Sequence, residues 1–163
     1  MSAIQHILDH KNIQVIIKRL SYQIAEDHIG ISDLGLVGLN ERGSYIANLL
    51  IDELMSVVPS LKTSFVRLDT EGDQLKFHDE LNKEVQHLVI VDDVLNSGRT
   101  AFLAAAHCYH DGLKSMEMAF LAVREHRSFP VYARYTGRSI ATTLQEHVYF
   151  DNANDEELSI YLK

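Results

Sequence analysis

The chain has few of the residues that mark a secreted, membrane-bound or modular protein. Its 163 residues include one cysteine, two prolines and no tryptophan. The single Cys108 cannot form an internal disulfide, which favours a reducing setting. No apolar run approaches the ~18 residues that a membrane-spanning helix needs, and the early polar residues His6, Asp9 and His10 do not resemble a signal peptide. We therefore expect a cytoplasmic protein with no membrane partner.

The length and the even composition predict a single domain over residues 1–163. No low-complexity run or proline-rich stretch indicates a linker. The formal net charge of −8 disfavours phosphate backbones as a general partner. The nine histidines are scattered, and the pairs His6/His10 and His107/His110 have no cysteine or acid in a metal-ligand pattern. We expect the histidines on a solvated surface.

Hydrophobic periodicity alternates between helices and short buried strands. Apolar residues at 13, 16, 17, 20 and 24 predict an amphipathic helix, and a second stripe over residues 46–57 predicts another that ends before Pro59. A third helix is predicted over residues 100–110, and the polar segment 69–86 predicts a hairpin or a mobile loop. Strands are predicted over residues 33–39, 65–68, 88–91, 116–123, 131–135 and 148–150.

This order is typical of a doubly wound α/β fold, with a mostly parallel sheet and flanking helices. Such folds bind their ligands at the carboxyl ends of the strands. The fold class therefore directs attention to the segments that follow predicted strands.

The stretch over residues 88–100 carries the most chemical information. Four apolar residues are followed by the acids Asp92 and Asp93, and a short polar loop then leads into a helix. The backbone N–H groups and the dipole at the start of a helix bind phosphate, here with help from the hydroxyls of Ser97 and Thr100. The carboxylates can accept hydrogen bonds from ribose hydroxyls or orient hydrated Mg²⁺. The pattern predicts a sugar-phosphate site; the alternative is an ordinary strand-to-helix turn capped by Asp93.

This stretch resembles the phosphoribosyl-pyrophosphate (PRPP) signature of the type I phosphoribosyltransferases. The resemblance covers nearly the whole chain and is nearest to the PyrR family, the pyrimidine operon attenuation proteins and uracil phosphoribosyltransferases. Further segments that carry it lie over residues 7–26, 36–43 and 126–140. It implies the type I phosphoribosyltransferase fold, with a small C-terminal hood region beside the sheet.

The implied activity joins a nucleobase, uracil above all, to PRPP and releases a nucleoside 5′-monophosphate and pyrophosphate, with Mg²⁺ as cofactor. The resemblance assigns catalysis and indirect contact with the metal to Asp92 and Asp93. It assigns PRPP binding to the same pair together with Asn96, Ser97, Gly98, Arg99 and Thr100, and pyrophosphate binding to Arg42 and Gly43 in a loop over residues 40–43. The base is assigned to Val123, Arg124 and Arg138.

Asn96 bears on the identity of the base. Purine-type relatives commonly carry Asp at this position as a base for the purine ring nitrogen, and an amide cannot accept that proton. Asn96 therefore disfavours a 6-oxopurine and favours a pyrimidine. Residues 40–41, 69–86 and 123–125 differ from the family pattern, which predicts weaker binding of pyrophosphate and a poorer lid over PRPP.

Two other functions stay open. One is a nucleotide-sensing, RNA-binding regulator of pyrimidine genes with little or no catalysis; the other is an interaction domain that kept the fold and lost the ligand. The net charge disfavours RNA. In each case the family implies a homodimer or higher homo-oligomer. The basic side chains available for RNA are Lys11, Lys18, Arg19, Arg127, Arg134 and Arg138.

Overall fold

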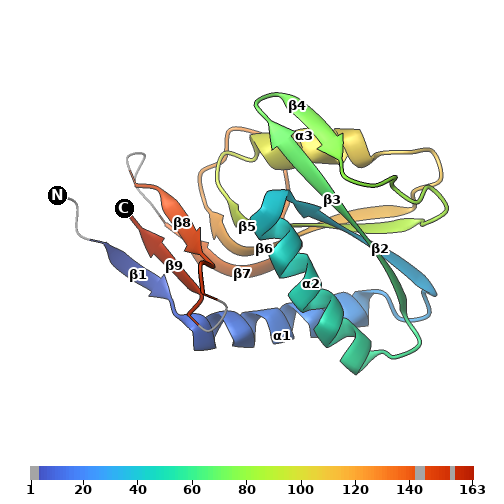
Figure 1. Ribbon diagram of the computed structural model, residues 1–163, viewed down its shortest axis with the longest axis horizontal. Helices are drawn as coiled ribbons and strands as arrows, with labels where there is room; N and C mark the ends of the chain where they lie inside the picture. The colour runs from blue at the N-terminus through green and yellow to red at the C-terminus, as the bar shows by residue number, and fades with distance from the viewer. Residues whose placement is uncertain (1–3, 142–145, 155–156) are drawn as a thin grey trace.

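A six-stranded sheet forms the centre of the molecule in the computed structural model, which describes residues 4–141, 146–154 and 157–163 (Figure 1). Its strand order is β4-β3-β2-β5-β6-β7, and every neighbouring pair is parallel except β3 and β4. The predicted α/β class with a mostly parallel sheet is confirmed. The strands are β2 (Asp33–Leu39), β3 (Lys62–Glu71), β4 (Gln74–Phe77), β5 (His87–Leu95), β6 (Ser115–Arg124) and β7 (Tyr135–Ile140).

Helices cover both faces of this sheet. The helices α1 (His10–Asp27) and α2 (Asn40–Val57) lie on one face, and α3 (Arg99–Cys108) lies on the other (Figure 1). The central strand β5 alternates accordingly: Val89 and Val91 pack in the core beneath α1 and α2, whereas Leu88 and Ile90 pack beneath α3. A strand buried on both faces needs a continuous apolar run, which residues 88–91 supply.

Helix α1 forms as the sequence predicts. Its apolar stripe is buried against the sheet and α2. Asp9 caps the helix: its side chain accepts from the backbone N–H of Asn12 at 2.8 Å, and the side chain of Asn12 accepts from the N–H of Asp9 at 3.3 Å. This reciprocal pair satisfies donors that a helix start would otherwise leave unpaired.

A second, antiparallel sheet forms a hood beside the first. Its order is β1-β9-β8, with β1 (Gln5–Leu8), β9 (Ser159–Leu162) and β8 (Val148–Asp151). Figure 1 shows that the hood lies at one end of the molecule, where both chain ends also lie. Phe150 and Ile160 are buried and anchor the hood to the core around α1. The sequence pattern predicts β8 but neither β1 nor β9, so the expected C-terminal hood includes an N-terminal strand as well.

One predicted strand was wrong in position. Residues 131–134 lie outside any strand, and β7 begins at Tyr135, the last residue of the predicted span. Val131 instead packs against the core beneath α3, and the Nε of Arg134 donates to Asp27 at 2.8 Å. Gly137 within β7 weakened the strand pattern there, because glycine is depleted in strands.

The polar segment 69–86 contains the hairpin β3–β4, which confirms the hairpin alternative. Its turn holds Gly72 at a φ of 63°, a conformation that glycine adopts without strain. Among the described residues, no helix has both the length and the apolar character to cross a membrane.

His28 corrects the expectation that the histidines are solvated. Its side chain is only 5% exposed at the end of α1. The Nδ1 atom lies 2.7 Å from the carbonyl oxygen of Ile24, and the Nε2 atom lies 3.5 Å from a carboxylate oxygen of Glu117. Two acceptors on neighbouring elements make burial of this ring acceptable.

Candidate functional site

The site lies where the winding of the sheet changes direction. β2 and β5 are parallel neighbours, but the chain leaves β2 through α2 toward β3 and leaves β5 through α3 toward β6. The segments that follow the two strands therefore diverge and leave a crevice between them. A cavity of about 320 Å³ occupies this position, and β8 of the hood forms its remaining wall.

The acid pair lies at the floor of this cavity. Asp92 and Asp93 belong to β5, which continues past the predicted end at Val91 because Val94 and Leu95 pair with β6. The backbone N–H of Asp93 donates to Oδ1 of Asp92 at 2.9 Å. Burial, followed by the negative charge of Asp93, raises the pKa of Asp92 well above its usual value. Two adjacent carboxylates of this kind favour a cation or a proton between them.

The loop after β5 presents the start of α3 to the cavity. Gly98 is the N-cap residue at a φ of 85° and has no side chain to cap the helix, and the hydroxyl of Ser97 accepts from the backbone N–H of Arg99 at 3.3 Å. The carbonyl oxygen of Ser97 accepts from the backbone N–H groups of Ser128 and Phe129, at 3.0 and 3.1 Å. A Cβ at Gly98 would lie 2.6 Å from Cγ2 of Val131, so only glycine fits between the loop and residues 128–131. Contacts with residues 128–131 thus hold the loop in this conformation.

Arg99 extends away from this loop. Its Nη2 atom donates to Oδ1 of Asp73 at 2.5 Å, and Asp73 lies in the turn of the β3–β4 hairpin. The Nη2–Oδ1 contact joins the first residue of α3 to the tip of the hairpin. Arg99 also lines the cavity, so a residue of the predicted phosphate loop contacts the predicted lid.

The segment after β2 is not the loop that the sequence predicts. Helix α2 begins directly at Asn40, which has a φ of 53°. The side chain of Asn40 holds this conformation by accepting from the N–H of Thr70 at 2.8 Å and donating to its hydroxyl at 3.0 Å. Arg42 therefore lies in the first turn of a helix, and its Nη1 is 3.8 Å from Oδ2 of Asp93.

Gly43 is buried and does not line the cavity. A Cβ at this position would lie 2.5 Å from the carbonyl oxygen of Val91 and 3.1 Å from Oδ1 of Asp92. The glycine lets α2 approach β5 closely, which brings Arg42 beside the acid pair. Its contribution to the site is this approach rather than a contact with the cavity.

Comparison with known proteins identifies the family. The family described as phosphoribosyl transferase domain matches residues 3–150. The chain belongs to the phosphoribosyltransferase family. Curated relatives include proteins named bifunctional protein PyrR from Leuconostoc mesenteroides, 32% identical over 88% of this chain and 89% of the relative, and from Haemophilus ducreyi, 35% identical over 87% and 86%. The resemblance stated from the sequence is thereby confirmed.

Solved structures of phosphoribosyltransferases share the fold. A hypoxanthine-guanine phosphoribosyltransferase from Bacillus anthracis matches with a TM-score of 0.71 at 18% identity, covering 85% of this chain and 84% of its own. A hypoxanthine phosphoribosyltransferase from Trypanosoma cruzi matches with a TM-score of 0.74 at 17% identity, covering 96% and 89%. At this identity the likeness extends to the fold of the family and not to the choice of base.

The residues predicted for the base pocket lie on the neighbouring strands β6 and β7 but do not line the cavity. Val123 is buried in the core beneath α3, and Arg138 lines a groove beside α1 with Lys11 and Val15. Arg124 ends β6 and, like the other two, is not among the residues that line the cavity. Their contact with a base stays a prediction that the lining of the cavity does not support.

Sequence reasoning missed several residues of the site. Phe120 of β6 lies beside Asp92 as its partner across the two strands, and the hood and Asn40 complete the lining of the cavity. A strand over residues 148–150 was predicted, but no local pattern showed that it lies over β5. The hood residues that line the cavity are His147, Val148 and Tyr149.

Proposed function

We propose that this protein is a phosphoribosyltransferase that joins uracil to PRPP, giving uridine 5′-monophosphate and pyrophosphate. One observation carries the proposal: a single cavity is lined by Asp92 and Asp93, by the loop over residues 96–100 at the start of α3, and by Arg42 on the opposite helix. The carboxylates match the ribose of PRPP, the backbone donors match its 5′-phosphate, and the guanidinium matches its pyrophosphate.

The residues act by positioning and by charge. In the reaction the base nitrogen forms a bond to C1 of the ribose, the C1–O bond to pyrophosphate breaks with its electron pair, and the nitrogen loses its proton. Positive charge develops on the ribose as that bond loosens, so carboxylates fixed beside the sugar stabilise the transition state. We assign this role to Asp92 and Asp93. The 5′-phosphate is assigned to Asn96, Ser97, Gly98, Arg99 and Thr100.

Mg²⁺ fits this donor set. Among the described residues, His, Cys, Asp and Glu side chains form no group of three or more that could hold a metal ion. Mg²⁺ is commonly held by one or two carboxylates together with substrate phosphates. Burial and the charge of Asp93 raise the pKa of Asp92, so a cation beside the pair, in addition to Arg42, would stabilise its charged form. Mg²⁺ held by PRPP and, through water, by this pair would neutralise the pyrophosphate as it leaves.

The base is assigned to the hood wall of the cavity. Tyr149, which is 37% exposed, supplies aromatic surface there, whereas Phe120 and Val148 are buried. A flat pyrimidine can pack on such a surface while C1 of the ribose, to which it becomes bonded, lies over the acid pair. Asn96 lines the same cavity and carries an amide in place of a base for a purine nitrogen, which supports a pyrimidine.

Incubation of the protein with PRPP, Mg²⁺ and a panel of bases tests this proposal. Uracil is expected to give its nucleoside monophosphate, with hypoxanthine and guanine far slower. Asp93→Asn should lower kcat by about a hundredfold or more, because a charge that stabilises the transition state is lost. Asp111→Asn, at an exposed position away from the cavity, is the matched control. No product from any base, together with no binding of PRPP, would contradict the proposal.

A nucleotide-sensing RNA-binding role is the second candidate. It is favoured by the groove in which Lys11 and Arg138 lie together, and by the word bifunctional in the names of the curated relatives. Two other side chains predicted to contact RNA already make contacts within the protein. Arg19 donates to the carbonyl oxygen of Gly137 at 2.6 Å, and Arg134 pairs with Asp27. Salt-sensitive binding of a hairpin RNA would support this role. Assembly as a homo-oligomer is proposed from the family alone.

A further inference from the structure

Strand β3 extends beyond the end of its neighbour β2. The two strands pair in parallel as far as Leu39 and Leu68, after which the chain leaves β2 into α2, while β3 continues into the hairpin with β4. Figure 1 shows β3 running past the start of α2. Because β2 no longer pairs with β3 beyond Leu68, the backbone of this extension needs other hydrogen-bond partners on that side.

The side chain of Asn40 takes the place of the next strand residue. Its Oδ1 accepts from the backbone N–H of Thr70 at 2.8 Å, and its Nδ2 and Oδ1 lie 3.0 and 3.2 Å from the hydroxyl oxygen of Thr70. The backbone N–H can only donate, which sets the orientation of the amide. Both residues are half-buried, so water competes weakly for these contacts. We name this set of contacts the Asn40–Thr70 clamp.

The clamp holds a backbone conformation that side-chain-bearing residues adopt rarely. Asn40 has a φ of 53°, and among the described residues no other non-glycine residue has a positive φ. Such a conformation persists where surrounding contacts stabilise it, and residues of this kind are concentrated at functional sites. Helix α2 begins at Asn40, so the conformation of this residue sets the direction in which the helix leaves the sheet.

The start of α2 faces the cavity of the acid pair. Asn40 and Arg42 both line that cavity, whereas Thr70 is not among the described residues that line it. The N-cap residue of α2 is Leu39, whose side chain has no acceptor, and the first N–H groups of a helix have no partner within the helix. These donors and the guanidinium of Arg42 suit an anion. The clamp therefore fixes the position of the groups proposed for pyrophosphate.

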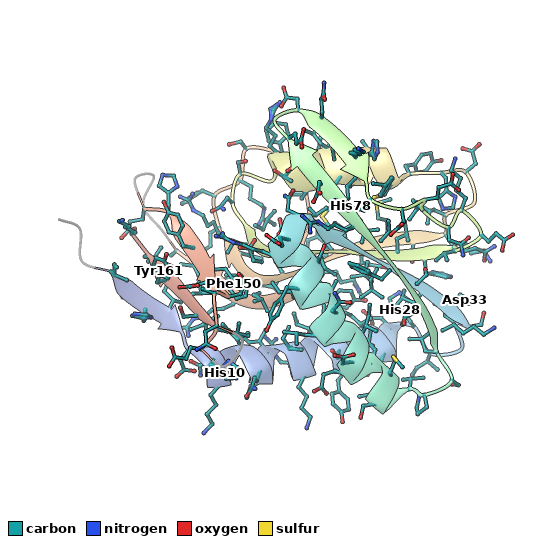
Figure 2. All side chains as sticks on the ribbon, in the orientation of Figure 1. His10, His28, Asp33, His78, Phe150 and Tyr161 are labelled. Atoms are coloured by element: carbon teal, nitrogen blue, oxygen red, sulfur yellow. The ribbon has the colours of Figure 1, made fainter. Side chains whose placement is uncertain are left out.

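The hairpin in turn holds Thr70. Thr70 pairs with Leu75 of β4, and one residue before it the carboxylate of Asp69 accepts from Nε of Arg67 at 2.7 Å and contacts the ring of His78. Figure 2 shows His78 on the hairpin side of the sheet. Contacts on both strands of the hairpin thus fix the residue that restrains the start of α2.

We propose that Thr70 is a positioning residue for the pyrophosphate half of PRPP, acting through Asn40 on the first turn of α2. Thr70 stays outside the cavity in this role. The inference rests on the proposed function, because that function assigns the pyrophosphate to the start of α2. It also gives a role to Asn40, a position at which the chain departs from the family pattern. A neutral amide forms the clamp without placing a carboxylate beside the pyrophosphate.

Calorimetric binding of inorganic pyrophosphate with Mg²⁺ to the full chain tests the proposal, with ribose 5-phosphate as the second probe. Thr70→Val keeps a β-branched side chain and the backbone N–H but removes the hydroxyl. Pyrophosphate binding should weaken about fivefold or more, because a half-buried hydrogen bond of the clamp is lost. Binding of ribose 5-phosphate should not change. In steady-state kinetics, KM for PRPP should rise by a similar factor with kcat unchanged.

Matched variants separate positioning from a general effect on the fold. Thr70→Ser keeps the hydroxyl and should bind pyrophosphate like the parent. Thr63→Val, opposite Leu34 near the other end of β3, removes a hydroxyl from the same strand and should also bind like the parent. Asn40→Gly allows the positive φ without the clamp and should weaken pyrophosphate binding at least as much as Thr70→Val. Adding Thr70→Val to Asn40→Gly should cause no further loss, because Thr70 acts through Asn40.

Three results would overturn the proposal: equal pyrophosphate binding by Thr70→Val and the parent, an equal loss of ribose 5-phosphate binding, or a further loss when Thr70→Val is added to Asn40→Gly. A parent that binds neither pyrophosphate nor PRPP would overturn it together with the proposed function. The expected pattern of pyrophosphate binding in a protein that makes no nucleotide from any base would support the proposal and contradict only the proposed transfer.

Discussion

At the scale of single residues, the paired negative charges of the acid pair favour ligand binding but lower the stability of the folded protein. Asp92 and Asp93 are adjacent carboxylates, and Nη1 of Arg42 is 3.8 Å from Oδ2 of Asp93 on a side chain that is 53% exposed. An exposed guanidinium at this distance is well screened and offsets little of the repulsion. The site therefore tolerates a charge that favours its ligand and disfavours its own fold.

Asp92→Asn should stabilise the protein while slowing transfer. Burial and Asp93 raise the folded-state pKa of Asp92, so the folded protein binds this proton more readily than the unfolded chain, and stability falls as pH rises through that range. The amide removes the penalty and can still accept from the N–H of Asp93. Thermal unfolding at pH 7.5 should show Tm higher by a few degrees, with activity reduced about a hundredfold. An unchanged or lower Tm would contradict this explanation.

At the scale of elements, the geometry of the site depends on how closely α2 approaches β5. Gly43 sits at the contact, where a Cβ would lie 2.5 Å from the carbonyl oxygen of Val91. That atom belongs to the backbone of a central strand, so it cannot move aside without disturbing the sheet. The helix would have to shift instead, and Arg42 would shift with it.

Gly43→Ala should therefore destabilise the fold by about 1–3 kcal/mol, as overpacking of a core contact does, and should raise KM for PRPP. Gly30→Ala is the control: a Cβ there meets no atom within 4 Å, but its φ of 81° is strained for alanine. It should cost about 1 kcal/mol and leave KM unchanged. Denaturant unfolding and steady-state kinetics measure both effects. Equal KM values for Gly43→Ala and the parent would show that the approach of α2 does not position Arg42.

At the scale of the whole molecule, a polar network joins the first helix to the central strands at the end of the sheet opposite the hood. Figure 2 shows His28 and Asp33 at that end. His28 faces Glu117 of β6, Ser115 Oγ donates to Glu117 at 3.4 Å, and Nδ1 of His87 on β5 lies 2.8 Å from the Ser115 hydroxyl. Segments far apart in the sequence are thereby coupled through titratable groups.

Stability should depend on pH through this network. The hydrogen bond to Glu117 outweighs burial and raises the pKa of His28 above 6.5, so its stabilising contribution is complete below pH 6.5 and is lost as pH rises through the folded-state pKa. Burial and the charge of His28 lower the pKa of His87, so its contribution has the opposite sign and is lost as pH falls below 6.5. Unfolding free energy measured from pH 5 to 8.5 should decline on both sides of a maximum.

Glu117→Gln isolates the His28 contribution. It should lower stability at pH 6 and flatten the decline above pH 6.5, because the buried imidazolium loses its carboxylate. Glu84→Gln, at an exposed position near the same end of the sheet, should leave the curve unchanged. Curves for Glu117→Gln and the parent that run parallel over the whole range would exclude the pair as the cause.

Much of the fold and part of the site could be predicted from local sequence. The stripe of α1, the apolar run of β5 and the transition from acids to a small polar loop each depend on residues within a few positions of one another. Backbone periodicity and helix-start chemistry act over that range. The strand over residues 131–135 was misplaced because Gly137 obscured β7, and β1 and β9 were missed because four-residue strands carry little pattern.

The sequence by itself determined that the chain presents two carboxylates and a small polar turn toward the end of a buried strand. Only the tertiary structure decided what faces them: Arg42 by the close approach of α2 at Gly43, Phe120 by the pairing of β5 with β6, and Tyr149 by the folding of the hood over the site. The physical reason is range. Local propensity specifies a helix or strand from its own residues. The segments against which that element packs lie far from it in the sequence, so they depend on the packing of the whole fold.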